Sequence, residues 1–186
     1  RRIAYDEIFS NLLMLIKARK IVKIKKAESK YFSPNIENKI LKNFPYKLTE
    51  GQKKILKELD QDTKSKLRMF RLIQGDVGSG KTILALILAA KVCESKYQVA
   101  YMAPTEILSK QQYVQAKKLF GLTNIKVEIL TSKTPNKKTI IENLSKGKID
   151  LIIGTHSLFQ KQIKFKNLGL IIIDEQHKFG VKQRMS

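Results

Sequence analysis

Hydrophobic and polar residues follow two different periodicities along the chain, and these predict helices in some segments and strands in others. From residue 68 onward, short apolar runs of strand length alternate with longer segments whose apolar residues recur every three or four positions. The runs 151–153 and 170–173 are wholly apolar, which predicts parallel strands buried on both faces and covered by helices. The predicted strands are 69–74, 98–102, 126–130, 151–154 and 170–173, and the predicted helices lie near 81–95, 105–119 and 136–146.

A different pattern precedes this α/β region. Residues 3–26 place apolar side chains at helical spacing without Pro or Gly, and the second half of the segment is strongly basic. A polar linker and a short helix at 36–43 follow. Thr49 and Gln52 then form a capping box that opens a helix to about residue 59. We therefore expect a helical appendage at 1–47 and an α/β domain at 48–186.

The net charge raises nucleic acid as a partner without deciding the question. The 186 residues include 37 basic and 16 acidic side chains, a net charge of +21, which would attract a polyanion. Most of the basic residues are Lys, which lacks the bidentate geometry of Arg, and they are spread along the whole chain. Charge alone leaves a nucleic-acid partner and a merely lysine-rich composition equally open.

Cysteine content and hydropathy exclude several classes. The single cysteine, Cys93, excludes an internal disulfide and a multi-cysteine zinc site, and it fits a reducing compartment. The longest apolar run, 83–90, is far shorter than the roughly 20 residues that span a bilayer. No signal peptide opens the chain, which begins with Arg1 instead of Met. We expect a cytoplasmic bacterial protein and a piece of a longer chain.

The strongest chemical signal is a glycine-rich segment that fits G-x-x-x-x-G-K-[ST] between a predicted strand and an apolar helix. Its glycines allow backbone N–H groups to converge on phosphates, where side chains would block the approach. Lys81 would contact the β- and γ-phosphate oxygens, and the Thr82 hydroxyl would bind Mg²⁺. The predicted nucleotide-binding residues are Gly75, Asp76, Val77, Gly78, Ser79, Gly80, Lys81 and Thr82.

Two adjacent carboxylates end the last predicted strand. Asp174 is expected to hold Mg²⁺, together with Thr82, and Glu175 to orient and deprotonate the attacking water. The predicted catalytic residues are therefore Lys81, Asp174 and Glu175, and together the motifs predict a Mg²⁺-dependent NTP hydrolase. The N/T-K-x-D motif that reads guanine is absent, which disfavours a GTPase.

Residues 174–177, Asp-Glu-Gln-His, resemble motif II of the superfamily 2 helicases, and 178–184 resemble its extension in the RecG family of bacterial branch-migrating DNA helicases. The phosphate loop and the segments 1–7, 103–108 and 154–158 fit the same family. The resemblance implies a RecA-like P-loop domain in an ATP-dependent DNA helicase that acts at forks and junctions in replication restart, recombination and repair. The transcription–repair coupling translocase is the nearest alternative, although Gln176 favours RecG. A non-catalytic basic remnant that binds nucleic acid is a third hypothesis.

The resemblance also implies further site residues. Gln52 matches an adenine-reading glutamine, with Phe44 or Tyr46 as stacking surfaces, although Gln52 could act only as a helix cap. The resemblance implies that four residues contact the phosphate backbone of DNA, namely Pro104, Thr105, Thr155 and His156. It also implies that Gln176 and His177 couple the nucleotide state to the DNA side. Thr105 could instead be an ordinary N-cap and His156 a buried core histidine.

Parts of the implied motor lie beyond this sequence. They are a second RecA-like lobe with an arginine finger, an upstream wedge domain, and a strand expected between the phosphate-loop strand and the Asp174 strand. Without that strand, two buried sheet edges would lack hydrogen-bond partners. We expect residues 1–186 alone to be marginally stable and to hydrolyse ATP at a negligible rate.

Overall fold

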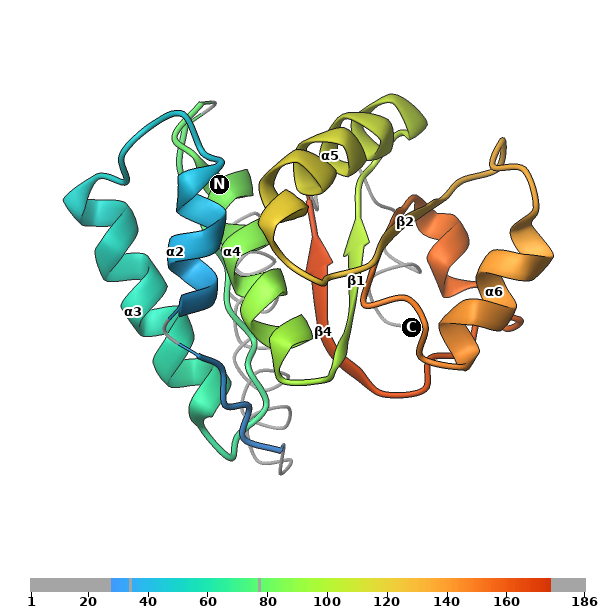
Figure 1. The fold of residues 1–186 in the computed structure, drawn as a ribbon, viewed down its shortest axis with the longest axis horizontal. Helices are drawn as coiled ribbons and strands as arrows, with labels where there is room; N and C mark the ends of the chain where they lie inside the picture. The colour runs from blue at the N-terminus through green and yellow to red at the C-terminus, as the bar shows by residue number, and fades with distance from the viewer. Residues whose placement is uncertain (1–27, 34, 77, 175–186) are drawn as a thin grey trace, which may run out of the picture. The chain divides into compact units, whose positions relative to one another are not determined.

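The computed structural model describes residues 28–33, 35–76 and 78–174. These form two compact units, one from residues 28–30 and 50–81 and the other from 31–49 and 82–174 (Figure 1). The predicted helix at 3–26 lies outside the described residues, as do Val77, Glu175, Gln176 and His177. The predicted domain boundary at residues 47/48 stays a prediction.

A four-stranded parallel sheet forms the centre of the larger unit. It comprises β1 (Gln98–Met102), β2 (Val127–Leu130), β3 (Leu151–Gly154) and β4 (Leu168–Ile173), in the spatial order β2-β3-β1-β4. Four of the five predicted strands are thus confirmed, with β1 and β3 matching to the residue. The register aligns the strand ends, since Met102 pairs with Gly154 on one side and with Ile173 on the other. The segments that follow these strands therefore leave the sheet at one edge.

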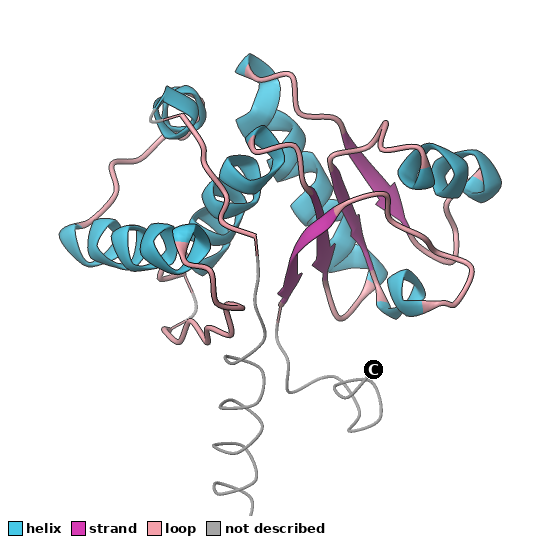
Figure 2. Ribbon diagram, turned by 90° about the horizontal axis from the view of Figure 1, so that it is seen from below, coloured by secondary structure: helices cyan, strands magenta, loops and turns pink. Residues whose placement is uncertain are grey.

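Helices cover both faces of this sheet (Figure 2). On one face, α6 (Lys137–Ser145) and the 3₁₀ helix η2 (His156–Phe159) close an apolar cluster that includes Ala100 and Ile152. Side chains alternate along a strand, so Tyr101 points to the other face, where α4 (Lys81–Glu94) lies. The unit also holds α5 (Glu106–Leu119), the 3₁₀ helix η1 (Phe120–Leu122) and α2 (Asn35–Lys42).

The sequence predicts that strand β4 is buried on both of its faces, but the strand is partly exposed. Ile171 and Ile173 are 48% and 40% exposed, whereas Leu151, Ile152 and Ile153 of β3 are fully buried. Within the described residues β4 pairs with β1 alone, so it is an edge strand and its side chains have fewer neighbours.

The smaller unit contains α3 (Glu50–Lys64) and the segment that leads into α4. The predicted strand at 69–74 is wrong: this segment is assigned neither strand nor helix and belongs to no sheet of the described residues. A strand needs a neighbour for its backbone N–H and C=O groups, and none of the described strands pairs with it. Arg71 instead attaches the segment to α3 through Asp62 at 2.7 Å and Glu58 at 3.3 Å.

Among the residues that the structure describes, no helix is both long and apolar enough to cross a bilayer.

Candidate nucleotide-binding site

The predicted phosphate loop has a backbone that only glycine adopts readily. Gly78 and Gly80 lie in the left-handed region, at φ +81° and +84°. A Cβ atom on Gly75 would come within 2.7 Å of the Ser79 hydroxyl oxygen. The loop therefore favours glycine at positions 78 and 80 because of their backbone conformation, and at position 75 because a Cβ atom would have to displace the Ser79 hydroxyl.

Lys81 folds back over this loop. Its Nζ atom donates hydrogen bonds to the carbonyl oxygens of Gly75 at 2.6 Å and Asp76 at 2.7 Å, and it lies 3.5 Å from the Ser79 hydroxyl. These acceptors are neutral and partly solvent-exposed, so phosphate oxygens could replace them without leaving a buried charge unpaired.

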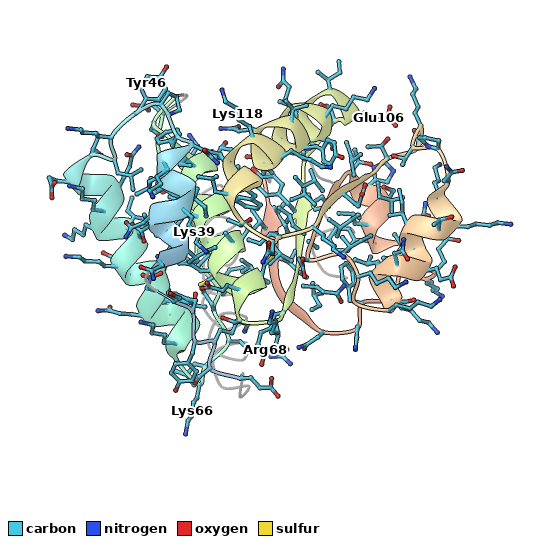
Figure 3. The ribbon with its side chains drawn as sticks, viewed as in Figure 1. Lys39, Tyr46, Lys66, Arg68, Glu106 and Lys118 are labelled. Carbon is cyan, nitrogen blue, oxygen red and sulfur yellow. The ribbon has the colours of Figure 1, made fainter. Side chains whose placement is uncertain are left out.

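Helix α3 contributes Gln52 to the same loop. The Gln52 side-chain amide donates to the carbonyl oxygen of Ser79 at 2.9 Å. This partner lies in the phosphate loop, outside the first turn of α3. The two candidate stacking rings, Phe44 and Tyr46, pack edge to face with centroids 5.6 Å apart, and Tyr46 is 73% exposed (Figure 3).

The two predicted metal ligands of the larger unit meet at one phenol. Tyr101 donates from its hydroxyl to a carboxylate oxygen of Asp174 at 3.3 Å, and the Thr82 side chain hydrogen-bonds the same hydroxyl. Burial is the main cause that raises the pKa of Tyr101, and the Asp174 charge adds to it, so the phenol keeps its proton. The Asp174 backbone N–H also donates to the Met102 carbonyl at 2.8 Å, which fixes the end of β4 against the end of β1.

The chemistry of these two ligands suits Mg²⁺. A hydroxyl and a carboxylate are hard oxygen donors, and Mg²⁺ in nucleotide sites is held by one or two such side chains together with phosphates and water. Within the described residues, no group of three or more His, Cys, Asp or Glu side chains gathers as a protein-only metal cage.

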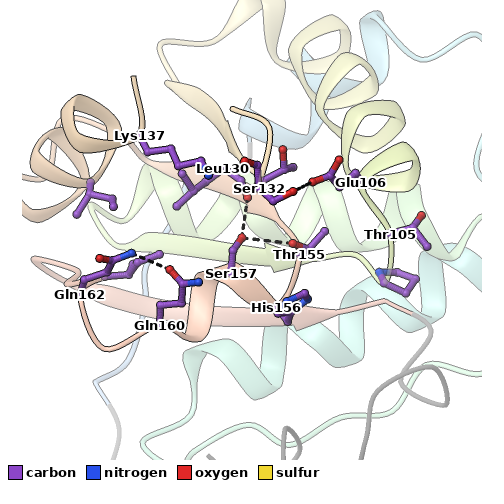
Figure 4. A pocket seen from close by; sticks show the side chains of 14 residues that line it. Thr105, Glu106, Leu130, Ser132, Lys137, Thr155, His156, Ser157, Gln160 and Gln162 are labelled. Carbon is purple, nitrogen blue, oxygen red and sulfur yellow. Dashed lines mark hydrogen bonds between the residues drawn. The ribbon is translucent and has the colours of Figure 1, made fainter. Parts of the chain in front are cut away.

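A separate pocket of about 240 Å³ lies where β1, β2 and β3 end (Figure 4). It brings together four residues predicted to contact DNA, which are Pro104, Thr105, Thr155 and His156. Thr105 is the N-cap of α5 and accepts from the Leu108 N–H at 3.2 Å, so its capping role is confirmed. His156 is exposed, so the alternative of a buried core histidine is wrong, whereas Thr155 is buried.

The pocket also contains polar residues that the sequence analysis did not single out. The Ser132 hydroxyl donates to the carboxylate of Glu106, and Lys137 donates to the Ser132 carbonyl at 2.5 Å. The hydrogen bond from Ser132 is the main cause that lowers the pKa of Glu106, so this carboxylate stays charged. Glu106 therefore ties the α5 N-terminus to the loop that follows β2.

Tyr101 is the residue of the candidate nucleotide site that the sequence analysis missed. It lies inside an apolar strand, where a tyrosine is ordinary, and its partner Asp174 is 73 positions away in the sequence. A strand register that set the end of β1 beside the end of β4 would have been the only signal.

Comparison with known proteins shows that this chain is similar to helicases. Residues 49–186 match the family described as DEAD/DEAH box helicase. The ATP-dependent DNA helicase RecG of Aquifex aeolicus is 42% identical over 186 residues, which cover 99% of this chain and 24% of that protein. RecG of Thermotoga maritima is 43% identical over 185 residues, covering 98% of this chain and again 24% of the relative.

The solved structures agree. A structure of RecG bound to a three-way DNA junction superposes with a TM-score of 0.84 at 41% identity, over 96% of this chain and 25% of that one. A hypothetical ATP-dependent RNA helicase from Sulfolobus tokodaii, at 20% identity, has a TM-score of 0.58 over 78% of this chain and 42% of that one, which indicates the shared fold alone.

These matches confirm the RecA-like α/β fold and favour RecG over the transcription–repair coupling translocase. The chain spans about a quarter of the length of the curated relatives it matches. By its match over residues 49–186, this chain belongs to the DEAD/DEAH box helicase family.

Proposed function

We propose that this chain is the ATP-binding lobe of a RecG-type DNA helicase, which couples ATP hydrolysis to movement on DNA at forks and junctions. The observation that carries the proposal is the position of the Lys81 ammonium, hydrogen-bonded to two loop carbonyls beside glycines at positive φ. A cation held by neutral, exposed carbonyl acceptors in a glycine-rich loop suits a triphosphate, whose oxygens can replace those acceptors.

Each predicted site residue has a role in this proposal. The loop 75–81 holds the phosphates and Gln52 contacts the adenine, while Thr82 and Asp174 hold Mg²⁺. When bound, the cation neutralises charge on the phosphate oxygens. Glu175 orients the attacking water by hydrogen bonding.

The proposed partner is branched DNA, bound without sequence preference. RecG as a relative has been solved on a three-way DNA junction, which supports this choice. Pro104, Thr105, Thr155 and His156 contact the phosphate backbone, and Gln176 with His177 couples that contact to the nucleotide. A second RecA-like lobe and a wedge domain would complete the motor. We place the protein in the bacterial cytoplasm, where it serves replication restart, recombination and repair.

The test compares Lys81→Ala with Lys118→Ala in the complete protein. Both substitutions remove one positive charge, but Lys118 lies exposed near the C-terminal end of α5 (Figure 3). We expect Lys81→Ala to lower junction-stimulated ATP hydrolysis about 10²- to 10³-fold, because a charge-stabilising contact to the phosphates is lost. Lys118→Ala should stay within about twofold of wild type, and both variants should bind a three-way junction.

Three results would contradict the proposal. Equal hydrolysis by Lys81→Ala and wild type would remove the phosphate loop from the reaction. Hydrolysis that linear duplex stimulates as well as a three-way junction would argue against branched DNA. Nucleic-acid binding with no ATP affinity in the wild type would favour the basic, non-catalytic remnant.

A further inference from the structure

We propose that Tyr101 is a positioning residue for the Mg²⁺ site, where its hydroxyl sets the orientation of Asp174 relative to Thr82. This inference rests on the proposed function, because it assigns a task to a side chain beside the two proposed metal ligands. Tyr101 itself touches neither nucleotide nor metal in this assignment.

The first argument is the convergence of three elements on one atom. The Tyr101 hydroxyl comes from β1, and it meets Asp174 at the end of β4 and Thr82 in the first turn of α4. Backbone pairing already ties the ends of β1 and β4, through the Asp174 N–H and the Met102 carbonyl. The phenol adds a side-chain hydrogen bond to the carboxylate itself, which backbone pairing cannot supply.

The second argument is the inventory of hydrogen-bonding atoms. A phenol has one proton, and it goes to a single oxygen, Oδ2, of the Asp174 carboxylate. A ligand held by such an outer partner is oriented before the metal arrives.

The third argument is burial. Tyr101 is 1% exposed, and the ring alone would satisfy the packing of this strand position. A buried hydroxyl costs free energy unless it is hydrogen-bonded, so the polar contacts of the Tyr101 hydroxyl must offset that cost. In the part of the chain that the structure describes, those contacts lead to the two proposed metal ligands.

The experiment measures Mg²⁺ dependence, since a packing role would leave it unchanged. In the complete protein, the affinity for ADP is measured calorimetrically in EDTA and across an Mg²⁺ titration, for wild type and Tyr101→Phe. We expect the apparent Mg²⁺ affinity to fall about tenfold, as for other outer-shell partners. The affinity for metal-free ADP and the midpoint of urea unfolding should match the wild type.

Two control variants make the test decisive. Tyr113→Phe removes a phenol hydroxyl from α5, where the Tyr113 ring contacts Lys117, and should leave the Mg²⁺ titration unchanged. Asp174→Asn weakens Mg²⁺ binding by itself. If the hydroxyl acts through Asp174, adding Tyr101→Phe to that variant lowers the Mg²⁺ affinity by less than about twofold more.

The outcomes separate the two proposals. A wild-type protein that binds no ADP, with or without Mg²⁺, overturns the proposed function itself. A wild type that binds Mg·ADP and a Tyr101→Phe variant with the same Mg²⁺ dependence overturns only the role of Tyr101. The role of Tyr101 is also overturned if Tyr101→Phe lowers the Mg²⁺ affinity by the full tenfold in the Asp174→Asn background. The same holds if Tyr101→Phe does not fold.

Discussion

Helix α4 carries a lysine near each end, and the two have opposite surroundings. Lys91, near the C-terminal end, is 3% exposed, lies 2.7 Å from the Glu37 carboxylate and stands over the Phe32 ring at 5.2 Å. Lys81, at the N-terminal end, is partly exposed and donates to backbone carbonyls of the glycine-rich loop. One lysine has a built-in counter-ion, and the other has acceptors that a ligand can replace.

This difference separates a structural charge from a functional one. A buried ammonium must stay paired, because removing its partner leaves an uncompensated charge in the interior. A charge that binds substrate must instead remain available, so its contacts in the free protein have to be weak enough to exchange. In the sequence both residues are lysines of one predicted helix. Their surroundings in the structure distinguish the structural lysine from the functional one.

The largest effect that would test this comparison is on stability. We expect Lys91→Met to lower the free energy of unfolding by about 2–3 kcal/mol, somewhat less than for a fully buried pair because Glu37 is partly hydrated. Lys81→Met should change it by less than about 0.5 kcal/mol. Urea unfolding followed by circular dichroism measures both.

A double variant sharpens the same result. Replacing both charges, as in Lys91→Met with Glu37→Leu, should recover most of the loss, since an apolar pair can substitute for a buried ion pair. Equal destabilisation by Lys81→Met and Lys91→Met would break the comparison.

A smaller effect is expected in the phosphate loop. Gly78→Ala should cost about 1 kcal/mol of stability, because an L side chain is strained at φ +81° even though the space around it is open. Gly121→Ala is the matched control, since a Cβ atom there meets only the Asn43 amide nitrogen at 3.7 Å. Unfolding midpoints that fall equally for both would show that the loop conformation carries no strain.

The smallest effect, no change at all, is expected for the thiol of Cys93. Cys93 is buried on α4 two residues from Lys91, and burial raises its pKa well above the ordinary value. At pH 8 the thiolate fraction of Cys93 is therefore below that of a free cysteine. We expect iodoacetamide not to modify Cys93 of the native protein during the time in which it alkylates a free thiol. Rapid alkylation detected by mass spectrometry would mean that this end of α4 opens readily.

Much of the fold could be predicted because its signals are local. The helices α4, α5 and α6 and the strands β1 and β3 follow from periodicity within a single segment. The strand predicted at 69–74 failed because an apolar run does not reveal whether a neighbouring strand exists. The prediction that β4 is buried on both faces failed for a related reason. An apolar run of this kind can form either a central strand or an edge strand of a sheet.

The sequence by itself determined the chemistry of the phosphate loop, because glycine spacing and an adjacent Lys81-Thr82 pair specify a local backbone and the groups on it. Tertiary structure alone decided that Tyr101 reaches Asp174 across 73 positions, and that Lys91 is buried against Glu37. These contacts arise from strand order and helix packing. Both are set by the summed burial of the whole unit, which no short stretch of residues encodes.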